Sequence, residues 1–127
     1  MVCIDTGVVI DFFREESYAV KHIENFSRTE EIFISSITVF ELLKGALRAE
    51  SQKTLEKTQA FVNRLRILYF DNKAAEIASG IFEDLRRKGL TVDPLDLLIA
   101  STSIANNQKL LTNNKKHFGK ISALDLA

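Results

Sequence analysis

Residues 2–13, VCIDTGVVIDFF, decide the fold. Val2–Ile4 is a short, apolar and partly β-branched run, which is typical of a buried strand. Asp5 ends that run, and from Thr6 to about Glu15 the apolar residues recur at helical spacing. A buried strand that gives way at an acidic residue to an amphipathic helix predicts the first unit of an α/β fold.

The same alternation continues along the chain. Further strands are predicted at Glu31–Ser35, Ile67–Phe70 and Lys109–Thr112, with a short edge strand at Ser122–Leu126. Between the strands, helical spacing of apolar residues predicts helices at about Tyr18–Phe26, Thr38–Ala49, Leu55–Leu65, Ala74–Leu85 and Pro94–Asn107. Strands separated by helices of this length predict a three-layer α/β/α fold with a central parallel sheet, formed by residues 1–127 as a single domain.

Composition limits the possible functions. The 127 residues include 17 Lys and Arg against 17 Asp and Glu, so the formal net charge is zero. A protein that holds nucleic acid mainly by bulk attraction usually carries a basic excess, so any such role here must rest on a local site.

No run approaches the roughly 20 apolar residues of a membrane span, and the one cysteine, Cys3, lies in an apolar run that predicts a buried thiol. We therefore expect a cytoplasmic protein.

Acidic and amide side chains gather where ligands bind in such a fold. In a parallel α/β sheet, strands end and helices begin at the carboxyl edge, and ligands collect there. Asp5 ends the first strand, Glu41 lies in the first turns of the helix after Glu31–Ser35, and Asp96 lies in the first turn of another helix. Asn114 follows the last clear strand. Four separate segments thus bring these side chains to one rim.

Each acid alone also fits a purely structural role. Thr38-Val39-Phe40-Glu41 matches a capping box, in which Glu41 would satisfy a backbone donor. Asp93-Pro94-Leu95-Asp96 matches a helix start with Asp93 as the cap, and Asp5 fits a plain cap of the first helix. Three carboxylates on one rim, however, repel one another unless a counter-ion is present. Oxygen ligands without a suitable His or Cys favour Mg²⁺ or Mn²⁺, and hence metal-dependent phosphoryl or phosphodiester chemistry.

The sequence resembles a known family. Three segments carry the resemblance: VCIDTGVVIDFF, ISSITVFELLKGA and VDPLDLLIASTSIANNQKLLTNNKKHF, spread from residue 2 to residue 118. In this order and spacing they resemble a PIN domain, and most closely the VapC-type toxin ribonucleases of prokaryotic toxin–antitoxin pairs. The resemblance implies an endoribonuclease that uses Mg²⁺ or Mn²⁺ to hydrolyse RNA.

The resemblance also implies roles for individual residues. Asp5, Glu41 and Asp96 would be the metal-binding and catalytic acids, with Glu41 or Asp96 accepting the proton of the attacking water. Thr6 would orient Asp5 or the bound water through its hydroxyl, and Asn114 would stand at the fourth acidic position. VapC-type proteins usually form homodimers and are held inactive by an antitoxin peptide, so a homodimer and a VapB-type antitoxin are expected partners.

Two departures from the family pattern bear on the site. Gly7 stands where the family usually has Asn, which removes a side-chain hydrogen bond that would hold the acids in place. Asn114 brings an amide in place of a carboxylate, so it adds no charge and one ion is expected rather than two.

Several other residues remain open to two interpretations. Lys44 and Arg48 share a helix face with Glu41, and Lys115 and Lys116 flank Asn114, so these four could bind RNA phosphates or be ordinary solvated residues. Asp11 could be an accessory acid or a solvated helix residue. Arg86, Arg87 and Lys88, followed by Gly89, fit the end of a helix better than a nucleic-acid patch; the apolar seam of Leu55–Leu65 could pack internally or against another protomer.

Other functions of α/β folds fit these residues less well or remain as alternatives. A haloacid-dehalogenase-type phosphatase needs a second acid two positions after Asp5, where this chain has Gly7. A response-regulator receiver needs an acid pair after the first strand and a Lys after the last, and neither is present. A PIN-like module that binds RNA or a partner without cleavage remains possible, because of Gly7 and Asn114.

Overall fold

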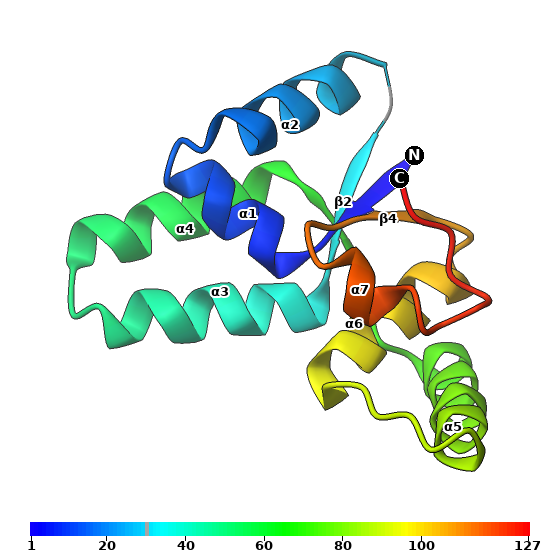
Figure 1. Ribbon diagram of the computed structural model, residues 1–127. Coiled ribbons are helices and arrows are strands. Elements are labelled where there is room, and N and C mark those ends of the chain that lie inside the picture. Colours follow the sequence, from blue (N-terminus) through cyan, green and yellow to red (C-terminus); the bar gives the residue numbers. More distant parts are fainter. Residues whose placement is uncertain (30) are drawn as a thin grey trace.

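The computed structural model describes residues 1–29 and 31–127 and is built on a parallel sheet (Figure 1). Its four strands are β1 (Val2–Ile4), β2 (Ile32–Ser35), β3 (Arg66–Leu68) and β4 (Lys109–Leu111), in the spatial order β3-β2-β1-β4. All three strand pairings are parallel. The predicted α/β fold with a central parallel sheet is therefore confirmed.

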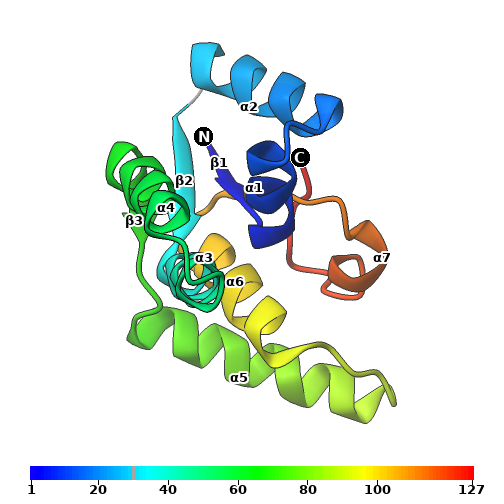
Figure 2. The same ribbon diagram turned by 90° about the vertical axis from the view of Figure 1, so that its left-hand side faces the viewer.

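Helices cover the sheet on both sides. Figure 2 places α2 and α5 at opposite ends of the molecule with the strands between them. The helices within the described residues are α1 (Thr6–Phe13), α2 (Ser17–Thr29), α3 (Ser36–Arg48), α4 (Gln52–Arg64), α5 (Asn72–Arg87), α6 (Pro94–Ala105) and α7 (Lys115–Phe118). None of these helices is long and apolar enough to cross a membrane, as judged over the described part of the chain.

The first strand separates two hydrophobic cores. Successive strand side chains point to opposite faces, so Val2 and Ile4 pack into one core with residues of α1 and α2, and Cys3 packs into the other with residues of α5 and α6. All three side chains are fully buried. Burial raises the pKa of the Cys3 thiol to about 11, which agrees with the expected inert core cysteine.

The strand order reverses beside β1. The chain runs from β1 through β2 to β3 on one side, and then returns to place β4 on the other side of β1. Ligands of open α/β sheets bind outside the carboxyl ends of the strands at such a reversal. Asp5 and Thr112, which directly follow β1 and β4, lie at this point.

The structure departs from the sequence predictions in four notable ways, besides shifts of one to three residues at the ends of other elements. The third strand covers Arg66–Leu68 instead of Ile67–Phe70, and the predicted edge strand at Ser122–Leu126 is reduced to a single bridge between Leu110 and Leu126. Lys115–Phe118 forms a short helix that was not predicted. The predicted seam of Leu55–Leu65 packs internally, since Phe61, Val62 and Leu65 contact the core beneath α1 and α2.

The start of α3 is the fourth difference, and it matters for the site. The helix begins at Ser36, two residues before the predicted start, because Ser35 is its N-cap and accepts a hydrogen bond from the Thr38 backbone N–H at 3.0 Å. Ser35 is fully buried. Ser51 caps α4 in the same way, accepting from Thr54 at 3.2 Å, but at the surface.

These two caps give a matched pair for a stability test. Ser35→Ala leaves a buried backbone N–H unpaired, so we expect it to lower the free energy of unfolding by about 2 kcal/mol, against about 1 kcal/mol for Ser51→Ala. Urea unfolding of both variants measures the difference. Equal losses would contradict the argument that burial makes the first cap the more important one.

Candidate metal and catalytic site

Asp5 lies at the carboxyl end of β1, with only 5% of its surface exposed. It occupies the N-cap position of α1, yet its side chain makes no capping bond there. Instead its Oδ2 accepts a hydrogen bond of 2.8 Å from the hydroxyl of Thr112, which follows β4. Burial raises the pKa of Asp5, the charge of Glu41 raises it further, and the Thr112 bond partly opposes both. Asp5 is thus a buried acid held from the neighbouring strand.

Glu41 reaches the same rim from α3. Its Oε1 accepts a hydrogen bond of 2.9 Å from the Thr6 hydroxyl, in the first turn of α1. The capping-box interpretation of Glu41 is therefore wrong, since Ser35 caps the helix. The Thr6 hydroxyl was expected to orient Asp5 or a bound water; the contact that it makes is with Glu41.

A chain of buried hydroxyls stands behind this contact. The Thr6 and Thr38 hydroxyl oxygens are 3.0 Å apart, and the Ser35 hydroxyl donates to that of Thr38 over 3.3 Å. A carboxylate can only accept and a hydroxyl has one proton. The Thr6 proton therefore goes to Glu41, and Thr6 accepts from Thr38. The cap of α3 and the position of Glu41 are parts of one network.

Asp96 is the third acid, in the first turn of α6. Asp93 caps that helix as predicted, accepting from the backbone N–H groups of Leu95 at 2.9 Å and Asp96 at 3.3 Å. Burial raises the pKa of Asp96 to about 6, with further contributions from the charges of Asp5, Asp93 and Glu41. The three acids thus lie within electrostatic reach of one another.

Asn114 is the fourth residue that was expected at the rim. It is the N-cap residue of the short helix α7, half-buried, and its side chain makes no capping bond. Its backbone N–H donates to the Thr112 hydroxyl at 3.0 Å. The same hydroxyl that holds Asp5 is therefore fixed by the backbone two residues further on.

The donor set fits a hard divalent cation. Asp5, Glu41 and Asp96 offer carboxylate oxygens. Burial is the main cause that raises the pKa of Asp5 and Asp96, and repulsion from neighbouring acids raises both further. Across residues 1–29 and 31–127, no three Asp, Glu, His or Cys side chains are close enough together to hold an ion. The acids therefore share a rim without forming a closed cage, and an ion that drew them together would relieve the repulsion.

Comparison with known proteins identifies the family. The family model for the PIN domain matches residues 2–124. The chain belongs to the PIN domain family. It is 31% identical to "Ribonuclease VapC1" of Methanocaldococcus jannaschii, over 98% of this chain and 84% of that protein. It is 30% identical to "tRNA(fMet)-specific endonuclease VapC" of Salmonella typhimurium, over 95% of this chain and 92% of that protein.

Solved structures agree on the fold of this PIN domain. A chain in the crystal structure of VapBC2 from Rickettsia felis, bound to a DNA fragment from their promoter, superimposes with a TM-score of 0.84 and 32% identity. The superposition covers 100% of this chain and 98% of the Rickettsia felis chain. The DNA-bound VapBC from Salmonella typhimurium gives a TM-score of 0.85 with 28% identity, over 100% of this chain and 98% of that one.

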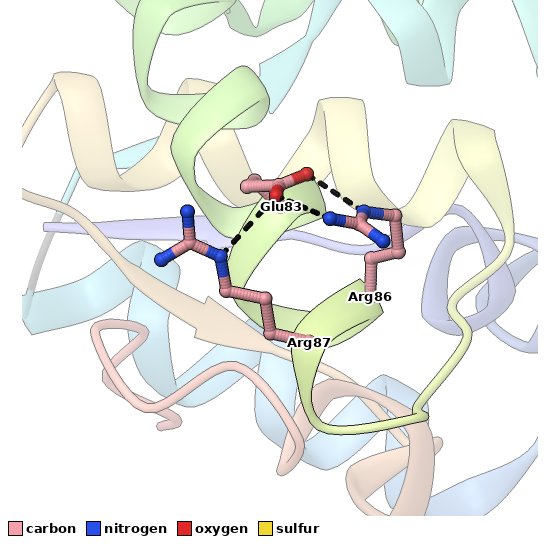
Figure 3. A network of polar contacts seen from close by, with 3 residues as sticks. All are labelled: Glu83, Arg86 and Arg87. Atoms are coloured by element: carbon pink, nitrogen blue, oxygen red, sulfur yellow. Dashed lines mark hydrogen bonds and ion pairs between the residues drawn. The ribbon is translucent and has the colours of Figure 1, made fainter.

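The basic residues of the PIN domain that the sequence singled out fall into two groups. Four of them are exposed beside expected site residues. Lys44 and Arg48 lie on α3, which carries Glu41, and Lys115 and Lys116 lie on α7, which Asn114 precedes. The basic end of α5 is different, because Glu83 accepts hydrogen bonds from both Arg86 and Arg87 (Figure 3). Gly89 follows with φ of 70°. This end of α5 is an ordinary helix terminus with its charges paired, as interpreted from the sequence.

Two residues of the rim were missed by the sequence analysis. Thr112 and Asn113 directly follow β4, yet only Asn114 was singled out from this segment. Thr112 holds Asp5, and the amide of Asn113 donates to Asp11 over 2.8 Å. Their position after a strand that neighbours β1 is the signal that could have found them. Asp11, which was open to two interpretations, is half-buried and bonded to Asn113 and Tyr18.

The raised pKa of Asp96 makes a prediction about stability. Its pKa in the folded protein, about 6, lies above the ordinary value of 3.8, so without metal the folded state loses stability as pH rises through this range. Asp96→Asn removes that cost. With a chelator present, we expect the variant to be about 1 kcal/mol more stable than the wild type above pH 6, a figure reduced for solvent screening of a half-buried group.

Thermal unfolding at a series of pH values tests this prediction. The advantage of Asp96→Asn should disappear below about pH 4, where the wild-type carboxyl is protonated in both states. The exposed Asp125→Asn is the matched control and should show no such dependence. A stability gap that did not change with pH would contradict the electrostatic explanation.

Proposed function

We propose that this PIN domain is an endoribonuclease that uses Mg²⁺ or Mn²⁺ to hydrolyse RNA phosphodiester bonds, and that it is the toxin of a VapBC-type pair. The observation that carries the proposal is the convergence of Asp5, Glu41 and Asp96 on the rim where the strand order reverses, with the pKa of Asp5 and Asp96 raised. Relatives that cover nearly the whole chain are named as VapC ribonucleases or endonucleases, which supports the same activity.

The three acids would hold the ion and move the proton. A bound Mg²⁺ or Mn²⁺ would supply positive charge at the scissile phosphate and make water a stronger nucleophile. Asp5, fixed by Thr112, would be the most rigid ligand. Glu41 or Asp96 would accept the proton of the attacking water as general base. The Thr6 hydroxyl would keep Glu41 turned toward the rim.

Basic side chains beside the rim would hold the RNA. Lys44 and Arg48 extend from the helix of Glu41, and Lys115 and Lys116 extend from the helix that Asn114 begins. Contacts of this kind bind phosphates and set the register of the chain without identifying bases. These four cations, two on α3 and two on α7, would provide local positive charge for RNA on a protein whose net charge is zero.

A VapB-type antitoxin is the partner that we propose, and an apolar pocket would receive it. The rings of Phe12, Phe13 and Phe61 lie in mutual contact between α1 and α4, with centroids 5.0 to 6.3 Å apart. They form the floor of an open pocket of about 470 Å³, lined by Phe12, Phe13, Glu15, Val20, Lys57, Ala60, Phe61 and Arg64. Lys57 and Arg64 line it together with Glu15, and this excess of positive charge would favour an apolar peptide with acidic flanks. A homodimer is also part of the proposal.

Cleavage of an end-labelled RNA pool tests the activity. Antitoxin-free protein should cut RNA with Mg²⁺ or Mn²⁺ and not with EDTA. Asp5→Asn and Asp96→Asn should each lower the rate by more than the 10–100-fold that loss of an outer partner of a metal site typically costs. Asp125→Asn, an exposed acid away from the rim, should cut at the wild-type rate.

The same experiment separates cleavage from binding. If the folded protein bound RNA equally with and without Mg²⁺ and never cut it, the chain would be a non-catalytic binding module. Cuts that persisted at the wild-type rate in Asp96→Asn would come from a contaminating ribonuclease.

A second experiment tests the antitoxin pocket. Ala60 is exposed and lines the pocket, so Ala60→Arg would fill it without disturbing the core. We expect it to weaken binding of the chain's VapB-type antitoxin at least tenfold, a loss of about 1.4 kcal/mol, with cleavage unchanged. Gln59→Arg, an exposed neighbour on the same helix that does not line the pocket, is the control. Equal affinity of both variants and the wild type, measured by calorimetry, would show that the antitoxin binds elsewhere.

A further inference from the structure

Asn113 links three segments at the edge of the acid rim. Its amide Nδ2 donates to Oδ2 of Asp11 on α1 over 2.8 Å and to the hydroxyl of Tyr18 on α2 over 2.9 Å. The Tyr18 hydroxyl in turn donates to Asp11. An amide group has two protons to donate, so both bonds can form together. Asn113 is thus hydrogen-bonded to both helices that follow β1, α1 and α2.

The same side chain fills the space above Gly7. A Cβ atom placed on Gly7 would lie 3.3 Å from Oδ1 and 3.8 Å from Nδ2 of Asn113, and 3.8 Å from Oδ2 of Asp5. The Asn113 carboxamide therefore occupies the volume beside Asp5 that a side chain at residue 7 would otherwise take. Gly7 and Asn113 are complementary: the absence of a side chain at one position admits the side chain of the other.

Asn113 contacts the same helix, α1, that lies next to two of the acids. Asp5 precedes α1 directly, and Thr6, in the first turn of the helix, contacts Glu41. The tilt of α1 against the end of β4 therefore sets both acids. Two consecutive residues fix that tilt, since Thr112 bonds Asp5 at the start of the helix and Asn113 bonds Asp11 further along it.

We propose that Asn113 is a positioning residue of the acid rim, which takes the place of a side chain at residue 7 and holds α1 in the orientation that presents Asp5 and Glu41. This inference rests on the proposed metal-dependent cleavage. Asn113 and Tyr18 are exposed, so their hydrogen bonds add little to global stability. The effect of Asn113 should therefore appear in metal binding and turnover.

A double-variant cycle tests the proposal. Asn113→Ala should lower kcat about tenfold and raise the Mg²⁺ concentration for half-maximal activity, with KM for RNA and Tm nearly unchanged. Gly7→Asn alone should also lower kcat, because its Cβ would crowd Asn113. In the double variant Gly7→Asn/Asn113→Ala, the amide on α1 reaches the vacated space, so kcat should recover severalfold over Asn113→Ala. The exposed Asn63→Ala on α4 is the matched control and should behave as wild type.

The possible outcomes separate this inference from the proposed function. Recovery in the double variant supports it, whereas losses that simply add, or a kcat loss matched by a fall in Tm, overturn it. If the wild type cuts no RNA but binds Mg²⁺, the same cycle is measured by calorimetric Mg²⁺ affinity, and unchanged affinity in Asn113→Ala overturns the inference. A wild type that neither cuts RNA nor binds Mg²⁺ overturns both proposals.

Discussion

The burial of one carboxylate constrains the rest of the structure. Asp5 follows a strand that is buried on both faces, so its charge lies where water cannot fully solvate it. A buried charge without a partner is strongly unfavourable. Two neighbouring segments accommodate this carboxylate. Thr112, which directly follows β4, donates a hydrogen bond to Asp5, and α1 begins without using the Asp5 side chain as a cap. The position of β4 beside β1 makes this arrangement possible.

The acids of the rim are stabilised to different degrees. Asp5 receives a hydroxyl donor from Thr112, and Glu41 receives one from Thr6. Asp96 has no such side-chain donor among the described residues, and burial together with three neighbouring acids raises its pKa to about 6. In the absence of a cation, a proton is the simplest way to neutralise Asp96. A metal ion and a proton would therefore compete for this carboxylate.

The sequence predicted the architecture because strand and helix periodicity are local properties. The parallel sheet, the order of elements and the Asp93 cap all followed from short windows. The start of α3 was missed since Ser35 and Thr38 both fit a cap, and only the structure shows that the Ser35 side chain accepts from the Thr38 backbone N–H. The Thr112–Asp5 and Asn113–Asp11 contacts join residues 107 and 102 positions apart, so no local pattern contains them. The acids could be singled out because Asp5 directly follows a strand, and Glu41 and Asp96 lie in the first two turns of a helix.

The strand order has a consequence for synthesis of the chain. The contact between Thr112 and Asp5 closes a loop over 107 positions, and β4 pairs with β1 on the side opposite β2. When the ribosome has added Asp96 but not yet Thr112, all three acids are present in the chain, but the residue that holds Asp5 is missing. Contacts of such long range form late, because the entropy of closing the loop must be overcome first. The rim is therefore assembled only after Thr112 has emerged, and a nascent chain carries its acids without the geometry to use them.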